Sequence, residues 1–217
     1  MLPVRFGELG RPPRFLFLGA HSDDIEIGCG ATILRLVGEH PGARVMWVVF
    51  SADDQREAEA RGSAQSFLDE AGAAADDIIV HRFRESYFPH EGAAVKDAFE
   101  ELKPFAPDVV FTHRRDDLHQ DHRTVAELTW NTFRDHVVLE YEIPKYEGDL
   151  GHPNLFVPLS DEIAGRKVEL LMEHFGTQRS KRWFRPATFE GLMALRGVEC
   201  AAPSGWAEAF HARKLVL

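Results

Sequence analysis

Short apolar runs alternate with stretches of helical character along the first two thirds of the chain. Four runs are apolar enough to be buried strands: residues 14–20, 44–50, 78–83 and 108–112. The segments that follow them have the spacing or composition of helices: residues 29–39, 55–71, 93–102 and 121–134. Strands that alternate with helices of this length form parallel β-α-β units with right-handed crossovers. The chain is therefore predicted to build an open α/β sheet.

The pattern is looser in the last third of the chain. It predicts strands over residues 137–143 and 154–159, a helix over 163–175 and a short strand over 192–196. No internal repeat, low-complexity tract or linker separates these segments from the rest. A chain of 217 residues also suits one hydrophobic core. We therefore predict a single domain over residues 1–217.

The composition limits which partners the protein can be expected to bind and in which compartment it can be expected to lie. The chain has 25 Lys and Arg against 35 Asp and Glu, a net charge of −10, so it gains no general attraction to nucleic acid or anionic membranes. No apolar stretch approaches the roughly 20 residues of a membrane span, and residues 1–14 lack the apolar core of a signal peptide. Two cysteines, Cys29 and Cys200, give no disulfide framework. We expect a cytoplasmic protein with neither a nucleic-acid partner nor membrane insertion; a homo-oligomer stays open.

Two polar segments follow predicted strands. Residues 19–30, GAHSDDIEIGCG, begin where the first strand ends, and residues 112–122, THRRDDLHQDH, begin where the fourth strand ends. The carboxyl ends of parallel strands share one edge of the sheet, which is the usual place for sites in open α/β folds. Segments that are distant in sequence can therefore meet there. Packing alone gives no reason to gather so many His and Asp residues at two strand ends.

The residue types in these segments favour a metal site. Imidazole and carboxylate are ligands that Zn²⁺ accepts, and three protein ligands plus water define its catalytic form. His21 and Asp24 on one turn, with His122 at a helix start, are the predicted ligands. Zn²⁺ lowers the pKa of a bound water to about 7. Asp23, next to Asp24, is suitably placed to accept a proton from that water as general base.

The second segment also offers a group that can stabilise a transition state. His119, one helical turn before His122, is predicted to stabilise an oxyanion when protonated, with Asp121 as the carboxylate that keeps it charged. Other interpretations stay open at this point. Asp23 and Asp24 can simply complement the dipole of the following helix, and His119 and His122 can both be ligands or both be surface residues. Spacing alone does not decide which histidines ligate.

The same residues resemble a known family. AHSDD, with GCG following, is similar to the AHPDDE-type signature of the PIG-L/LmbE-like zinc N-deacetylases, and DLHQDHR is similar to their H-x-D-H signature. Gln178 stands where many relatives carry Ser-Gln, and residues 205–210, GWAEAF, resemble their closing Tyr-Ala-Glu-x-Phe. The stretch YEIPK, residues 141–145, is similar to members found among enzymes that modify sugars and glycans. The resemblance covers nearly the whole chain.

The resemblance implies a role for each matching residue. It implies zinc ligation by His21, Asp24 and His122, a general base at Asp23, and oxyanion stabilisation by His119 with Asp121 in support. Several positions depart from the family pattern, among them Thr177, where Ser is commoner, and residues 51–54, which lack the Gly-rich form often seen after the second strand. Ser22 stands where relatives have Pro, and Glu26 stands one position later than their usual acidic residue. Neither departure removes a ligand.

Taken together, the sequence predicts an α/β fold, a Rossmann-like three-layer sandwich with a mostly parallel sheet. It predicts a zinc-dependent hydrolase that removes the N-acetyl group from an N-acetylated amino sugar or sugar-containing small molecule. The resemblance implies that Arg56, after the second strand, binds substrate, and a solvated helix face is the open alternative. His113, directly after the fourth strand, is predicted to face the site and to bind substrate, with metal contact as its open alternative. Two other functions stay open: a metal-dependent amidase or esterase for a different acyl group, and a non-catalytic sugar-binding relative. The choice of zinc over iron or cobalt follows family precedent more than ligand chemistry.

Overall fold

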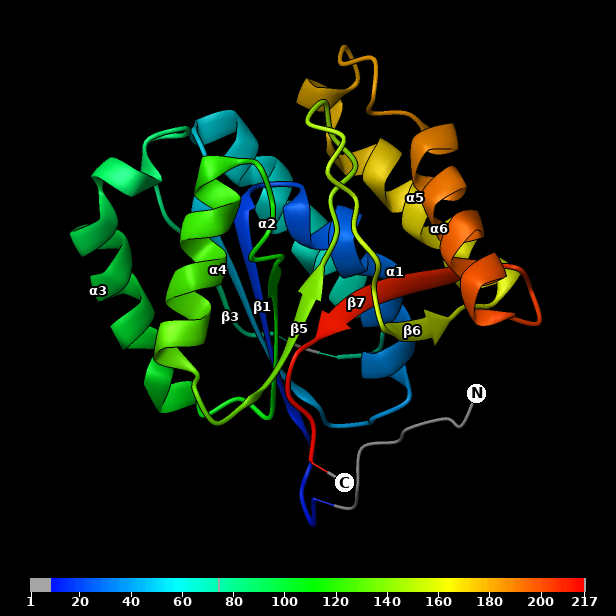
Figure 1. Ribbon diagram of the computed structural model, residues 1–217, viewed down its shortest axis with the longest axis horizontal. Helices are drawn as coiled ribbons and strands as arrows, with labels where there is room; N and C mark the ends of the chain where they lie inside the picture. The colour runs from blue at the N-terminus through cyan, green and yellow to red at the C-terminus, as the bar shows by residue number, and fades with distance from the viewer. Residues whose placement is uncertain (1–8, 74, 217) are drawn as a thin grey trace.

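A mixed sheet forms the centre of the molecule in a computed structural model that describes residues 9–73 and 75–216 (Figure 1). The strands of the sheet are β1 (Arg14–His21), β2 (Arg44–Ser51), β3 (Ala75–Val80), β4 (Val109–His113), β5 (Val137–Tyr141), β6 (Leu155–Pro158) and β7 (Ala207–Ala212). The helices are α1 (Asp24–Gly38), α2 (Asp54–Glu70), α3 (Gly92–Leu102), α4 (Gln120–Thr132), α5 (Asp161–His174) and α6 (Pro186–Cys200). Short 3-10 turns are η1 (Phe88–His90), η2 (Lys103–Phe105) and η3 (Gly176–Gln178).

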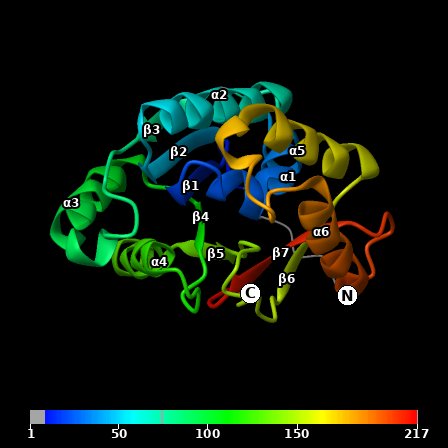
Figure 2. The ribbon, with the colours of Figure 1, turned by 90° about the horizontal axis from the view of Figure 1, so that it is seen from above.

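Helices cover both faces of this sheet. Figure 2 shows α1, α2 and α5 on one face and α3 and α4 on the other, with α6 beside β6 and β7. Strand β1 is apolar from Phe15 to Ala20 because its side chains enter a core on each side. Phe15 and Phe17 join the core under α1, α2 and α5, whereas Leu16 and Leu18 join the core under α3 and α4. The predicted three-layer α/β sandwich is confirmed.

The order of the strands reverses at one point in the sheet. The order is β3-β2-β1-β4-β5-β7-β6. The pairs from β3 through to β5 are parallel, and β7 is antiparallel to both β5 and β6. The chain moves outward from β1 to β3 and then returns to the other side of β1 with β4. Ligands of such sheets bind at the carboxyl ends of the strands where the order reverses. Here that place lies between β1 and β4, at the upper edge in Figure 1.

The predicted element boundaries hold least well around α1 and β3. Helix α1 begins at Asp24, whereas the predicted helix began at residue 29. Its first residues are buried on all sides, so they show no amphipathic pattern. Strand β3 spans Ala75–Val80, whereas the prediction was 78–83. These shifts move the ends of elements and leave their order unchanged.

One predicted strand is wrong, and one strand was missed. Residues 192–196 lie inside α6, where Pro186 occupies the first turn and the buried Phe189 and Met193 have helical spacing. The segment forms a helix because its apolar residues at helical spacing are buried on one face, although the short apolar run within it suggested a strand. Strand β7, which closes the sheet, was not predicted because its sequence, AEAFHA, is poor in the β-branched residues that mark strands.

Residues 1–8, 74 and 217 lie outside the described residues. They include most of the N-terminal stretch that was searched for a signal peptide, and they belong to the predicted domain of residues 1–217, which stays a prediction. Among the described helices, none combines the length and the apolar character that a bilayer crossing requires.

Candidate metal centre

Three side chains from two distant segments converge at the carboxyl ends of β1 and β4. His21 ends β1, Asp24 begins α1, and His122 lies in the first turn of α4. Nδ1 of His21 lies 3.3 Å from Oδ2 of Asp24 and 3.2 Å from Nε2 of His122. The remaining separation, between Nε2 of His122 and Oδ2 of Asp24, is 3.5 Å. All three residues are buried. The predicted ligands thus present three donor atoms to one point.

The separations of these donor atoms fit a tetrahedral cation. Zinc–ligand bonds of about 2.0–2.1 Å at tetrahedral angles place two ligand atoms about 3.4 Å apart. Two other groups of donors also lie close enough to hold an ion: His21 with His119 and His122, and Asp24 with His113 and His122. His122 is common to all three groups. The donor set of imidazoles and a carboxylate suits zinc and its neighbours in the first transition row.

A carboxylate backs each of the two predicted histidine ligands. Oδ2 of Asp121 lies 3.2 Å from Nε2 of His21, and Oδ2 of Asp117 lies 3.1 Å from Nδ1 of His122. Such partners fix the ring orientation and the tautomer of a metal-binding imidazole. The predicted pairing of Asp121 with His119 differs from this arrangement. Among the described residues, the hydrogen bonds to the Asp121 carboxylate come from His21, Ser86 and Phe88.

Sequence reasoning missed Asp117 and the lysine that holds it. The Asp117 carboxylate accepts hydrogen bonds from the backbone N–H of His119 (2.7 Å) and from Nζ of Lys145 (2.9 Å). Lys145 also pairs with Asp149 at 2.6 Å within the loop after β5, and its bond to Asp117 ties this loop to the loop after β4. Asp117 stands in the same His- and Asp-rich segment as His122, so its position was a usable signal. Lys145 gave none apart from its place in YEIPK.

The charges of the cluster determine which imidazole carries a proton. Burial disfavours a charge on His21, but Asp24 and Asp121 outweigh it and raise the pKa of His21 to about 10. Burial and the neighbouring His113 lower the pKa of His122 to about 3. Burial alone would raise the pKa of the Asp24 carboxyl, but the surrounding imidazoles hold it well below its ordinary value. A cation that binds here therefore displaces a proton from His21 and finds His122 already neutral.

Asp23, the predicted general base, is buried beside the donor cluster and pairs with the guanidinium of Arg56. Nη2 of Arg56 donates to Oδ1 of Asp23 at 2.8 Å. Burial raises the pKa of Asp23, although Arg56 acts in the opposite direction. Arg56 was predicted to bind substrate; the structure places it against Asp23, with Glu85 at 3.7 Å on its other side. The arginine thus holds the carboxylate that neighbours the ligands.

His119 lies at the N-terminus of α4, where its ring acts as a helix cap. Nδ1 accepts a hydrogen bond from the backbone N–H of Asp121 at 3.3 Å, which leaves Nε2 to carry the proton of the neutral ring. The centre of its ring lies 5.0 Å from that of His21 and 4.6 Å from that of His122. Burial and the charge of His21 lower the pKa of His119. The structure therefore favours a neutral donor over the protonated ring that was predicted.

His113 is fully buried behind His122. Its ring stacks on that of His122 with centres 3.9 Å apart. Nε2 accepts a hydrogen bond from the backbone N–H of Ala20 at 2.9 Å and lies 3.3 Å from the Tyr141 hydroxyl. With no exposed surface, His113 has no face for the substrate contact that was predicted. Its position suits the support of His122.

Fold and site together define a class of α/β proteins with a cluster of His and Asp side chains that could hold a metal ion at the switch point of the sheet. The sequence comparison then names the family. Residues 16–133 match the family model described as GlcNAc-PI de-N-acetylase, PIG-L. The chain belongs to this family. No curated protein matches the chain in sequence.

Solved structures share the fold at low sequence identity. The conserved protein TT1542 from Thermus thermophilus has a TM-score of 0.71 at 18% identity, over 94% of this chain and 95% of that one. The N,N'-diacetylchitobiose deacetylase from Pyrococcus horikoshii has a TM-score of 0.71 at 19% identity, over 92% and 83%. GalB, the 4-carboxy-2-hydroxymuconate hydratase from Pseudomonas putida, has a TM-score of 0.74 at 14% identity, over 94% and 98%. Since one of these is a hydratase, the fold alone does not determine the reaction.

Proposed function

We propose that this chain is a zinc-dependent N-deacetylase that acts on an N-acetylated amino sugar or a sugar-containing small molecule. The observation that carries the proposal is the convergence of His21, Asp24 and His122 at 3.2–3.5 Å, with Asp23 directly before Asp24 in the chain. Membership of the de-N-acetylase family supports the same reaction. So does the activity of the chitobiose deacetylase of similar fold. The proposal includes a cytoplasmic location, in line with two unpaired, buried cysteines, Cys29 and Cys200.

The reaction adds water to the acetamide carbonyl and breaks its C–N bond, which yields acetate and a free amine. A divalent cation held by the three ligands supplies Lewis acidity, which activates water and polarises the carbonyl. Asp23 accepts a proton from the attacking water and returns it to the departing amine. A carboxyl whose pKa is raised by burial is suited to both transfers. Arg56 holds the Asp23 carboxylate in place through its 2.8 Å hydrogen bond.

His119 stabilises the charge that develops on the carbonyl oxygen. Because Nδ1 is used by the backbone N–H of Asp121, the ring presents Nε2–H as a neutral hydrogen-bond donor. A donor of this kind that is fixed before the reaction contributes on the order of 3 kcal/mol to the transition state. Asp121 and Asp117 keep the rings of His21 and His122 in the orientation that points their donor atoms at one place.

The proposal is tested by the variant Asp23→Asn in zinc-loaded protein. Asparagine has nearly the same shape but accepts no proton, so turnover of an N-acetyl amino sugar should fall by about 10²–10⁴-fold while bound zinc is retained. Released amine and acetate measure turnover, and elemental analysis measures zinc. Asp54→Asn is the matched control, since Asp54 is exposed and pairs with Arg82. An Asp23→Asn protein as active as the parent contradicts the assignment of the base.

A substrate panel separates the proposed reaction from the alternatives. The parent protein is assayed with N-acetyl, longer N-acyl and O-acetyl substrates, and with an unsaturated carboxylic acid for hydratase activity. Preference for the N-acetyl sugars supports the proposal. Preference for another acyl group identifies an amidase or esterase. Zinc binding without turnover of any substrate in the panel identifies a sugar-binding relative.

A further inference from the structure

Helix α1 is broken one turn after Asp24. Cys29 has φ −146° and ψ 19°, whereas a regular α-helix has about −63° and −42°. A break of this kind leaves backbone carbonyls before it and N–H groups after it without their helical partners. The helix is buried at this point, so water does not supply the missing partners. Other polar groups of the protein must therefore supply these hydrogen bonds.

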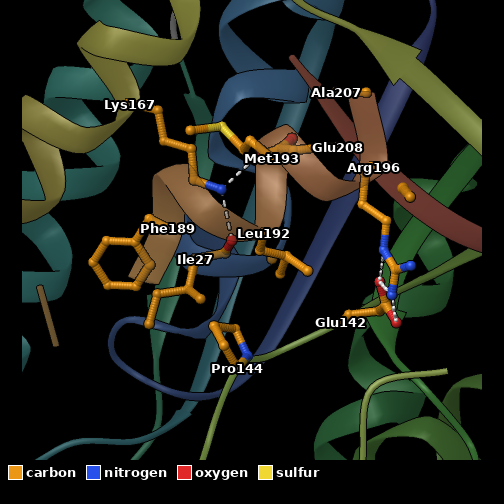
Figure 3. Close-up of a pocket in the computed structure, with 12 residues that line it drawn as sticks. Ile27, Glu142, Pro144, Lys167, Phe189, Leu192, Met193, Arg196, Ala207 and Glu208 are labelled. Atoms are coloured by element: carbon orange, nitrogen blue, oxygen red, sulfur yellow. Dashed lines mark hydrogen bonds and ion pairs between the residues drawn. The ribbon is translucent and has the colours of Figure 1, made fainter. Parts of the chain in front are cut away.

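One buried ion pair serves both sides of the break. Nζ of Lys167, from α5, donates to the carbonyl oxygen of Ile27 at 2.7 Å. The carboxylate of Glu208, from β7, accepts from the backbone N–H groups of Ala31 (3.0 Å) and Thr32 (2.7 Å). Lys167 and Glu208 also contact each other, with Nζ 2.5 Å from Oε1 (Figure 3). Both side chains are less than 5% exposed.

The turn before the break is packed against the strand that supports the site. A Cβ atom on Gly28 would lie 2.2 Å from Cδ2 of Tyr141, so only glycine allows this approach. The Tyr141 hydroxyl donates to the carbonyl oxygen of Leu18 in β1 at 2.6 Å. Gly28 thus lets the turn before the break lie close to β5, while Asp24 in the first turn lies beside His21 and His122.

The cavity beside the ion pair is too small for a substrate. It has a volume of about 20 Å³ and is bordered by Ile27, Phe189 and Met193 as well as the pair itself (Figure 3). Such a space holds roughly one water molecule. The predicted ligands, base and oxyanion donor are all absent from its lining. Lys167 and Glu208 therefore act on the backbone of α1 and have no ligand of their own here.

We propose that Lys167 and Glu208 are positioning residues that hold the Asp24-bearing turn of α1 at the metal centre. Without the pair, the backbone at Cys29 is free to adopt regular helical angles, and the first turn rotates against the rest of α1. The Asp24 carboxylate then moves away from the two imidazoles. The inference rests on the proposed metal-dependent function, because it concerns the geometry of that centre.

The test is the affinity for Co²⁺ of the double variant Lys167→Met/Glu208→Ala. Changing both residues leaves no lone buried charge, which protects the fold. The dissociation constant should rise about tenfold, which is the lower end of the loss of affinity caused by removing groups that orient metal ligands. It is measured by competition with a chromophoric chelator, and circular dichroism checks that the variant is folded. Lys167→Met/Glu208→Gln also leaves no lone buried charge, keeps one acceptor oxygen for the N–H groups of α1 and should show a smaller rise, which provides a second folded variant.

Met193→Ala is the matched control, since Met193 lines the same cavity and its side chain has no hydrogen bond to α1 among the described residues. This variant should lower stability and leave the Co²⁺ affinity unchanged. Parent-like affinity in both double variants overturns the inference. So does an equal loss of affinity in Met193→Ala, because the pair would then act only through general stability. A parent protein that binds no divalent cation overturns the proposed function itself.

Discussion

Two regions of the chain contribute to the metal centre in different ways. The first, residues 14–133, supplies the predicted ligands, the base and the oxyanion donor, and nearly coincides with the segment matched by the family model. The second, residues 134–216, supplies buried ion pairs: Lys167 with Glu208, and Glu142 with Arg196. Partners in the first pair are 41 residues apart and in the second 54. Chemistry that needs a few residues at fixed spacing leaves a motif in the sequence, whereas support from pairs of distant residues leaves none.

The largest effect that this comparison predicts is the loss of metal on His122→Ala. The variant removes one of three donor atoms, so zinc affinity should fall by more than the roughly 100-fold that the loss of a supporting carboxylate can cost. His211→Ala, in β7 of the second region, is the control and should bind zinc as the parent does. Elemental analysis after gel filtration measures the bound metal. Normal zinc content in His122→Ala would end the assignment of the chemistry to the first region.

The next effect is a dependence of metal affinity on pH. In the metal-free chain the pKa of His21 is about 10, so this imidazole is protonated at neutral pH and must lose its proton when a cation binds. Affinity should therefore rise by about tenfold per pH unit between pH 6 and pH 8. Competition with a chelator at several pH values measures the slope, and an indicator dye in weak buffer counts the released proton.

The second region should not contribute to this slope. Burial acts to raise the pKa of Glu142, but His211, Arg196 and the backbone N–H of Gly151 together hold it below its ordinary value, so this carboxylate stays ionised between pH 6 and pH 8. Glu142→Gln should therefore leave the slope unchanged even where it lowers stability. A slope near zero in the parent would mean that His21 enters the site already neutral.

The sequence was most informative where function depends on neighbouring residues. His21, Asp23 and Asp24 follow directly from one strand, and the order of strands and helices in the first region was correct. The support of these residues was not predictable, because it is made by the fold. Asp121 backs His21, one hundred residues away, and its expected partner His119 is instead occupied by the backbone. Only the folded sheet edge brings these groups together.

The start of α1 could not be predicted for a related reason. Helix prediction depends on a difference between a buried and an exposed face, and the first residues of α1 are buried all round. The roles of Gly28 and Gly30 are visible only in the fold, where an added Cβ atom would meet Tyr141 and Phe67. The partners that stabilise the broken helix, Lys167 and Glu208, lie more than a hundred residues away.

The smallest predicted effect is the loss of stability when a helix cap is removed, and it is compared for two caps, one in each region. The Asp53 side chain accepts from the backbone N–H of Arg56 at the start of α2, and the Ser160 hydroxyl accepts from that of Ile163 at the start of α5. Asp53→Ala and Ser160→Ala should each cost about 1 kcal/mol, which lowers Tm by roughly 2–4 °C in a chain of this size. Calorimetry on the two variants measures this common loss.

The two cap variants should differ in turnover although they lose the same amount of stability. The Asp53 cap fixes the turn from which Arg56 reaches Asp23, so Asp53→Ala should also lower turnover severalfold. Ser160→Ala should leave turnover unchanged, because its cap lies far along the chain from every residue that touches the proposed reaction. Equal turnover losses in both variants would show that activity follows overall stability. The two regions would then not differ in how their helix caps affect turnover. A loss of turnover confined to Asp53→Ala would instead show that the first region contributes more than the predicted ligands, because its backbone at the start of α2 also orients Arg56.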